Sequence, residues 1–148
     1  MPRVSFYLSG DTDERQRLKI ACRLAEQAYL SGQKILISLR DAAQLQQFDD
    51  LLWTFADRSF VPHEPYREDS QWQDTPVLLG CDSRPEQPFD LLINLSDAVP
   101  PAVSLATQVT EIIDADDARR KAGRTRFRQY RDQGMTPDTH DIAAEQTP

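Results

Sequence analysis

Apolar residues follow two rhythms along this chain, and segments of the two kinds alternate. Short, nearly continuous apolar runs are typical of strands that are buried on both faces of a parallel sheet. Apolar residues that recur every three or four positions are typical of a helix with one buried face. The runs predict strands at 3–8, 34–39, 76–80 and 89–95, and the periodic segments predict helices at 13–31, 41–53 and 116–133.

Turn and capping residues support these boundaries. The turn Ser9-Gly10-Asp11-Thr12 precedes the first helix, and Gly32 stands where a left-handed C-terminal cap is expected. Asp41 can cap the second helix, and Gly134 ends the third. Strands that alternate with capped helices predict a mostly parallel sheet between helix layers, in a Rossmann-like three-layer α/β/α fold.

Three segments fall outside the two rhythms. Residues 56–76 have no periodicity and are expected to form a long loop. Residues 102–113 leave a strand and a short helix equally open. Residues 135–148 have little to bury, so we expect them to fray or to be disordered. In a chain of 148 residues, this organisation predicts one domain at 1–134 followed by a tail.

Positive charge is concentrated in the last predicted helix. Seven of the seventeen Lys and Arg residues lie in the run RRKAGRTRFRQYR at 119–131, which contains no acid. The rest of the chain has ten cations against twenty-four acids, so a basic stripe stands on an acidic body. One third of the helix circumference would carry four arginines and a phenylalanine: Arg120, Arg124, Phe127, Arg128 and Arg131.

This stripe predicts an acidic partner, although a solvated helix face has the same pattern. A guanidinium grips a carboxylate or a phosphate through two parallel hydrogen bonds, and Phe127 adds an apolar contact. The combination suits a peptide that ends in an aromatic residue and a free carboxylate, and it suits a nucleic-acid backbone as well. The net charge of −7 argues against general binding to DNA or to anionic membranes.

No combination of residues predicts catalysis, a metal site or a cofactor. Gly10 is the one glycine of the first strand-to-helix turn, so the dinucleotide fingerprint is absent. His63 and His140 are the two imidazoles, and we expect His63 to be a loop residue hydrogen-bonded to backbone. Cys22 and Cys81 are expected to be buried free thiols. No membrane span or signal peptide is evident, which predicts a cytoplasmic protein.

A second segment combines large apolar residues with a loop. Trp53 continues the apolar stripe of its helix, which favours a position in the core. Phe60 and Val61 instead stand in the aperiodic segment, before Pro62, which holds the backbone extended. Exposed apolar residues on a rigid loop are a common basis for a protein interface, and this is the function we predict for the pair.

Several of these motifs together resemble the chi subunit family of bacterial DNA polymerase III. The resemblance extends in order from Arg3 to about Gly134, and SFVPH after L-W is its most specific part. Its elements are FYL in the first strand, L-W at the end of a helix, SFVPH at 59–63, DLLINLS at 90–96, and R-x-x-x-R-x-x-F-R-x-Y-R in the last helix.

The resemblance implies a non-catalytic Rossmann-like protein with two partners. Members of the family pair with the psi subunit, which connects them to the clamp-loader complex, and they bind the acidic, phenylalanine-ended tail of single-stranded DNA-binding protein. Contact with DNA would then be indirect. By matching positions, the tail would be held by Arg120, Arg124, Phe127 and Arg128. The matched candidates for psi are Trp53, Phe60, Val61 and Pro62.

Overall fold

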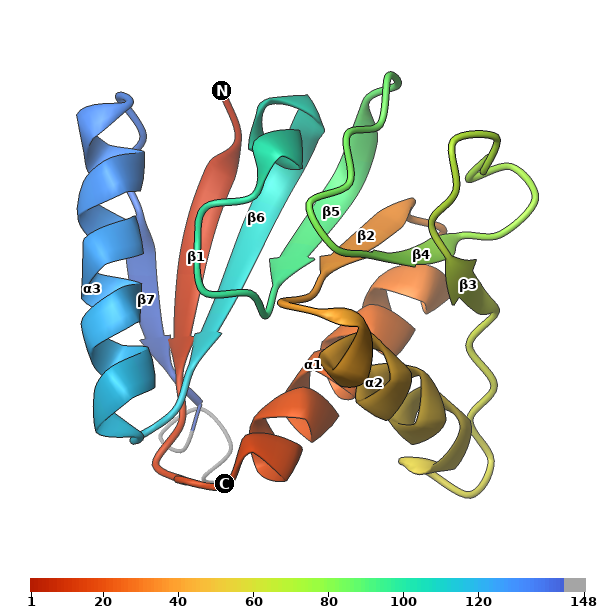
Figure 1. The fold of residues 1–148 in the computed structure, drawn as a ribbon, viewed down its shortest axis with the longest axis horizontal. Coiled ribbons are helices and arrows are strands. Elements are labelled where there is room, and N and C mark those ends of the chain that lie inside the picture. Colours follow the sequence, from red (N-terminus) through yellow and green to blue (C-terminus); the bar gives the residue numbers. More distant parts are fainter. Residues whose placement is uncertain (143–148) are drawn as a thin grey trace.

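Parallel strands form one continuous sheet in this protein. The computed structural model describes residues 1–142. The strands are β1 (Arg3–Leu8), β2 (Ile35–Ser38), β3 (His63–Pro65), β4 (Val77–Gly80), β5 (Phe89–Asn94), β6 (Ala106–Ile113) and β7 (Asp138–Asp141). Within the described residues they lie in the order β3-β4-β2-β5-β6-β1-β7, and every neighbouring pair is parallel (Figure 1).

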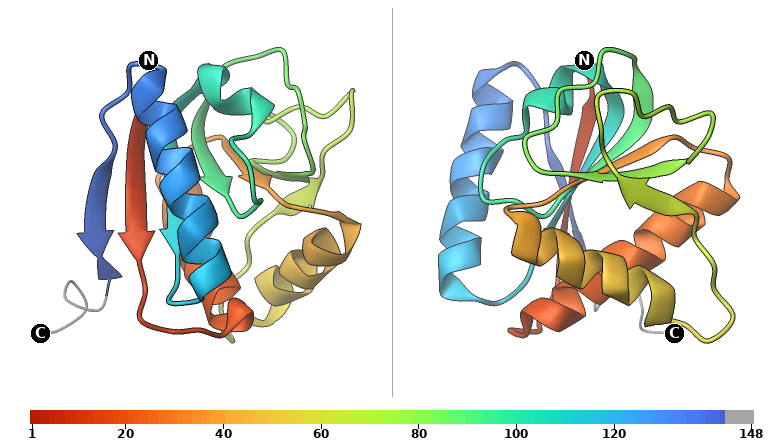
Figure 2. Two further views of the ribbon diagram at one scale, coloured as in Figure 1. Left: turned by 60° about the vertical axis from the view of Figure 1, so that its left-hand side comes forward. Right: turned by 45° about the vertical axis from the view of Figure 1, so that its right-hand side comes forward.

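Helices cover both faces of the sheet. They are α1 (Glu14–Leu30), α2 (Ala42–Thr54), the short 3-10 helix η1 (Pro101–Leu105) and α3 (Asp117–Asp132). α1 and α2 lie together on one face, and α3 lies on the other beside β1 and β7 (Figure 1, Figure 2). Side chains of β2 alternate accordingly: Ile35 and Ile37 pack in the core beneath α1 and α2, while Leu36 packs in the core on the α3 side. The predicted Rossmann-like three-layer fold is confirmed.

Local side-chain chemistry sets the ends of the helices. The carboxylates of Asp13, Asp41 and Asp116 accept hydrogen bonds from backbone N–H groups in the first turns of α1, α2 and α3. Gly32 and Gly134 have φ values of 79° and 92°, in the left-handed region that favours glycine after a helix. The predicted caps at Asp41, Gly32 and Gly134 are therefore confirmed.

The two ambiguous segments both contain a strand. Residues 102–113 divide between the end of η1 and β6, so both of the structures left open occur, one after the other. The predicted loop at 56–76 contains the short edge strand β3, which pairs with β4. Its three residues are too few to show a pattern, since His63 and Glu64 are polar and Pro65 is atypical of a strand.

The prediction that the tail begins at Met135 is wrong for the described residues. Met135 is buried, and β7 pairs in parallel with β1 from Asp138 to Asp141. The ring of His140 stacks on Tyr7 at a centroid distance of 5.1 Å. An edge strand such as β7 can be polar, because backbone hydrogen bonds to its neighbour are what mainly hold it. Apolar patterning does not detect a strand of this kind. Residues 143–148 of the predicted tail lie outside the described residues.

Because β7 covers one side of β1, its removal should destabilise the whole sheet. We expect truncation after Pro137 to lower the free energy of unfolding by about 1–3 kcal/mol, through loss of the β1–β7 hydrogen bonds. Urea unfolding followed by circular dichroism would measure this. Truncation after Ile142 keeps β7 and is the control, and an equal loss in both proteins would contradict a stabilising role for β7.

Candidate functional site

A groove of about 490 Å³ lies between α3 and the sheet. The side chains that line it from α3 are those predicted to bind an acidic peptide, together with the backbone of a glycine: Arg120, Gly123, Arg124, Phe127 and Arg128. The sheet contributes a largely apolar floor: Phe6 and Leu8 of β1, Ile113 of β6 and Thr139 of β7. The three arginines are exposed, so the groove has a cationic rim above apolar side chains. Such a site can bind a ligand that is both anionic and apolar.

The spacing of the cations and a close helix contact give the groove its shape. Arg120, Arg124 and Arg128 recur every four residues, so they form one row along the helix. Gly123 packs directly on β6, where a β-carbon would stand 2.8 Å from Cδ1 of Ile113. Phe127 contacts Phe6 with a ring-centroid distance of 5.2 Å. α3 therefore lies close to the sheet at Gly123 and Phe127, and its row of arginines stands along the edge of the groove.

Arg126 has a different place from its neighbours in the basic run. It is 2% exposed, and its Nε and Nη2 lie 3.1 Å from Oε1 of Glu111, which is fully buried in β6. The hydroxyl of Tyr130 donates to Oε2 of the same carboxylate at 2.7 Å. Burial and this carboxylate raise the pKa of Tyr130, which keeps the hydroxyl a donor. Sequence analysis missed this cluster, although Gly123, Arg126 and Tyr130 have the helical spacing of a buried face.

Arg119 anchors the start of α3. Its Nη2 lies 2.7 Å from Oδ2 of Asp114, and its Nη1 lies 3.2 Å from Oε2 of Glu14 on α1. The hydrogen bond to Asp114 raises the pKa of Arg119. Burial opposes ionisation of Asp114, but the Arg119 side chain and the Asp116 N–H more than offset it, and the pKa of Asp114 lies below its usual value. This cluster joins the first turns of α1 and α3.

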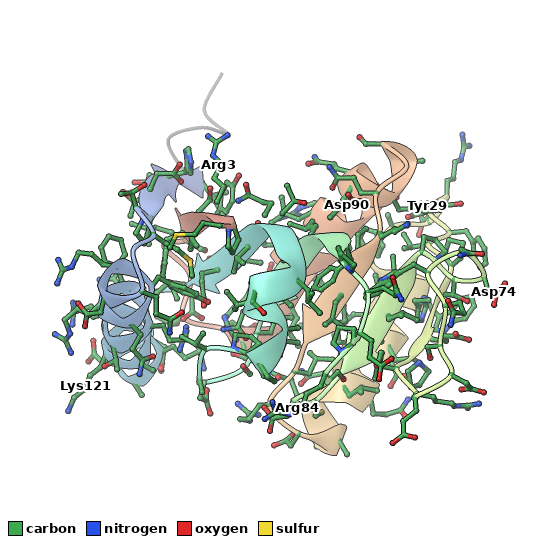
Figure 3. All side chains as sticks on the ribbon, turned by 90° about the horizontal axis from the view of Figure 1, so that it is seen from above. Arg3, Tyr29, Asp74, Arg84, Asp90 and Lys121 are labelled. Carbon is green, nitrogen blue, oxygen red and sulfur yellow. The ribbon has the colours of Figure 1, made fainter. Side chains whose placement is uncertain are left out.

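The other cations of the run do not line the groove. Lys121 points outward from α3, at the end of the molecule opposite to Asp74 in the β3–β4 loop (Figure 3). Arg131 is exposed and, although the helical pattern grouped it with the cationic face, it is not among the groove residues. The groove therefore uses three of the seven cations of the run.

The predicted apolar surface is partly as expected. Phe60 is 62% exposed and contacts Trp53, which is 55% exposed, with a ring-centroid distance of 5.6 Å. The core position favoured for Trp53 is therefore wrong, because Trp53 lies about 100° or more around α2 from the buried residues Phe48, Leu51 and Leu52. Val61 is 1% exposed, so the expectation that it is exposed with Phe60 is also wrong. Pro62 is half-buried beside this pair.

Polar contacts hold this apolar surface in place. Nδ1 of His63 donates to the carbonyl oxygen of Val61 at 2.7 Å, which confirms the predicted backbone hydrogen bond. Nε2 of His63 lies 2.9 Å from Oδ1 of Asp49, at ion-pair distance but outside hydrogen-bond alignment. The hydroxyl of Ser59 bonds the carboxylate of Glu26 on α1. With Val61 inserted in the core, these contacts fix the loop that carries Phe60.

Metal ligands, thiols and membrane spans were the other features considered in the sequence, and residues 1–142 show where each stands. No group of three or more His, Cys, Asp or Glu side chains in this range could hold a metal ion. Burial raises the pKa of Cys22 to about 12, as suits a core thiol. Cys81 is exposed, so the prediction that it is buried is wrong; it follows the last residue of β4, where the strand leaves the core. None of the helices in the described part of the chain is long and apolar enough to cross a membrane.

Comparison with known sequences identifies a family. The family model described as "DNA polymerase III chi subunit, HolC" matches residues 1–138. A protein of Pseudomonas aeruginosa named DNA polymerase III subunit chi is 39% identical over 142 residues, which cover 96% of this chain and 98% of that protein. A protein of the same name from Haemophilus influenzae is 35% identical over 140 residues, covering 94% and 96% of the two chains.

Comparison with solved structures concerns the fold alone. The crystal structure of T4 UvsW matches 95% of this chain and 42% of its own, with a TM-score of 0.63 and 11% identity. The C-terminal domain of the DEAD-box protein Dbp5 matches 93% of this chain and 90% of its own, with a TM-score of 0.59 and 10% identity. At such low identity these likenesses carry no functional argument.

The Asp114–Arg119 contact predicts how acid affects stability. Since the pKa of Asp114 is lower in the folded than in the unfolded chain, its contribution is present above the unfolded value and is lost as the pH falls through the folded value. We expect Asp114→Asn to lower the free energy of unfolding by about 1–3 kcal/mol at pH 7, with a smaller difference at pH 3. Urea titrations at both pH values would measure this, and an equal difference at both would contradict it.

Proposed function

This chain belongs to the DNA polymerase III chi subunit family, and we propose that it is a non-catalytic accessory subunit of the bacterial DNA polymerase III holoenzyme. In this role it links the clamp-loader complex, through the psi subunit, to single-stranded DNA-binding protein during DNA replication. The proposal includes a cytoplasmic location and no cofactor. The observation that carries it is the groove beside α3, where a cationic rim and an apolar floor occur together.

The groove suits the tail of single-stranded DNA-binding protein that the family resemblance implies. The guanidinium groups of Arg120, Arg124 and Arg128 would receive the terminal carboxylate and the acidic side chains of the tail. Its last aromatic ring would lie on Phe127 and on the floor formed by β1 and β6. A carboxylate and a ring on one terminal residue lie close together, as the rim and the floor do here.

The second surface is the proposed contact with the psi subunit. Trp53 and Phe60 would be its exposed aromatic anchors, with Pro62 at their side. Val61 would support the surface from the core instead of touching the partner. α2, which carries Trp53, and α3 lie on opposite faces of the sheet (Figure 1, Figure 2). Both partners could therefore be bound at once, as a linking subunit requires.

Direct binding of single-stranded nucleic acid by the same helix is the alternative. Two observations disfavour it: only three cations line the groove, and the chain as a whole has a net charge of −7. Nucleic-acid affinity comes mainly from many phosphate contacts, which such a surface does not provide. Contact with DNA through the single-stranded DNA-binding protein fits the charge distribution better.

A single arginine should separate tail binding from psi binding. We expect Arg128→Ala to weaken binding of a tail peptide by about 1.5–3 kcal/mol, through loss of a charge-assisted hydrogen bond, and to leave psi binding unchanged. Isothermal titration calorimetry would measure both affinities. Arg131→Ala is the matched control, because it removes the same charge from the same helix outside the groove. Equal weakening by both substitutions would show that net charge alone accounts for binding.

The form of the ligand separates the two candidate functions. A groove for a peptide terminus should bind an acidic peptide ending in phenylalanine much more tightly with a free carboxylate than as its amide. A nucleic-acid site should prefer a poly-dT oligonucleotide, with affinity that falls steeply as salt rises. Fluorescence anisotropy with the three ligands would decide, and tight oligonucleotide binding without preference for the free carboxylate would support the alternative.

The aromatic surface gives the complementary prediction for psi. We expect Trp53→Ala and Phe60→Ala each to lower affinity for psi by at least ~1 kcal/mol, because exposed aromatic anchors dominate such interfaces. Binding of the tail peptide should not change. Leu30→Ala, at a residue that is 74% exposed at the end of α1, tests whether any exposed apolar side chain has this effect. Unchanged psi affinity in both aromatic variants would exclude this surface as the contact.

A further inference from the structure

A buried polar cluster beneath α3 joins the helix to three other segments. Nε of Arg126 lies 3.1 Å from both carboxylate oxygens of Glu111, and its Nη1 donates to the carbonyl oxygen of Asp97 at 3.0 Å. Nδ2 of Asn94 on β5 donates to Oε2 of Glu111 at 2.8 Å, and the hydroxyl of Tyr130 donates to the same oxygen at 2.7 Å. Glu111 thus receives donors from α3 and from the neighbouring strand.

Because the cluster is buried, its charged groups lose their hydration, and this desolvation lowers its net contribution to stability. Glu111, Asn94 and Tyr130 are 0% exposed, and Arg126 is 2% exposed. A buried ion pair is commonly replaceable by apolar side chains of similar size without loss of stability, since desolvation offsets most of the attraction. What apolar side chains cannot reproduce is direction, because the guanidinium fork and the carboxylate must meet in one orientation.

Direction matters here because the apolar contacts of α3 are few, and Arg119 fastens the first turn of the helix alone. Its buried residues are Gly123, Arg126 and Tyr130, and Phe127 is half-buried. Apolar packing along so narrow a stripe gives little resistance to rotation of the helix about its own axis. Such a rotation would carry the groove arginines with it. Tyr130 also packs edge-on against Phe6, with a ring-centroid distance of 6.0 Å, so the cluster is continuous with the groove floor.

We propose that the Glu111–Arg126 pair, with the Tyr130 hydroxyl, is a positioning device that sets the rotation of α3 and so holds Arg124, Phe127 and Arg128 over the groove. The pair contributes orientation to ligand binding more than it contributes stability to the fold. This inference rests on the proposed function in one respect, because it takes the groove to be the site for an acidic, phenylalanine-ended peptide.

Apolar replacement of Glu111, Arg126 and Tyr130 together separates orientation from stability. The variant carries Glu111→Leu, Arg126→Met and Tyr130→Phe, which leaves no unpaired charge in the core. We expect its urea unfolding midpoint to equal or exceed that of the unsubstituted protein. We expect its affinity for a synthetic acidic peptide ending in phenylalanine with a free carboxylate to fall at least roughly tenfold, the loss expected when one charge-assisted hydrogen bond is out of place. Its preference for that peptide over the amidated form should also fall.

Two further variants keep the test decisive. Arg126→Lys retains the charge opposite Glu111 but loses the planar fork, so it should also bind more weakly, with a reduced preference for the free carboxylate. Leu52→Ala removes a buried side chain from the core on the opposite face of the sheet and controls for plain destabilisation. In the absence of urea, where this variant is folded, it should bind the peptide with full affinity and with full preference for the free carboxylate.

The positioning role would be overturned if the folded cluster variants bound the peptide with full affinity. It would also be overturned if Leu52→Ala lost as much affinity as they do. Failure of the triple variant to fold would leave Arg126→Lys to decide between these results. Failure of the proposed function would look different, because the unsubstituted protein itself would then show no preference for the free carboxylate. The two hypotheses therefore fail by different observations.

Discussion

A parallel sheet must be covered on both faces, and in the described residues this chain does so with three α-helices of unequal distribution. α1 and α2 share one face, while α3 and the short η1 cover the other. α3 alone is too narrow to cover all three of the strands β6, β1 and β7 on this face. The groove between α3, β1 and β7 follows from this shortage, because part of the sheet beside the helix remains accessible. The proposed peptide site is thus a consequence of how the core is covered.

The same shortage explains why α3 is fastened by charges. Six of the sixteen residues of α3 are arginine, so the helix has few apolar side chains to pack on the sheet. Arg126 and Arg119 take over part of that role through Glu111 and Asp114. Residues that look alike in the sequence therefore have opposite tasks. Some hold the helix to the fold, and others face outward over the groove. The basic run is one segment with two functions, and position on the helix decides between them.

Much of this arrangement could be predicted from the sequence, and each failure has an identifiable cause. Apolar rhythm detects residues that need burial, so it located the main strands and helices, but it missed β7, which is held by backbone pairing. It placed Trp53 in the core because the residue is apolar, but an apolar residue near the end of a helix can be exposed. Periodicity placed Arg120, Arg124 and Arg128 together, as the groove does, but it added Arg131, which lies outside the groove. It did not show that Arg126 is paired in the core, because its partner, Glu111, is fifteen residues away in the chain.

The separation of the two surfaces has a physical basis that goes beyond distance. The groove stands on the core cluster that contains Phe6, Ile113 and Tyr130, whereas Val61 anchors the aromatic surface in the cluster beneath α1 and α2. The sheet lies between these clusters, and side chains of each strand alternate between them. Groups without shared partners generally contribute independently. Binding at one surface should therefore leave the other available, as the proposed role in linking two partners requires.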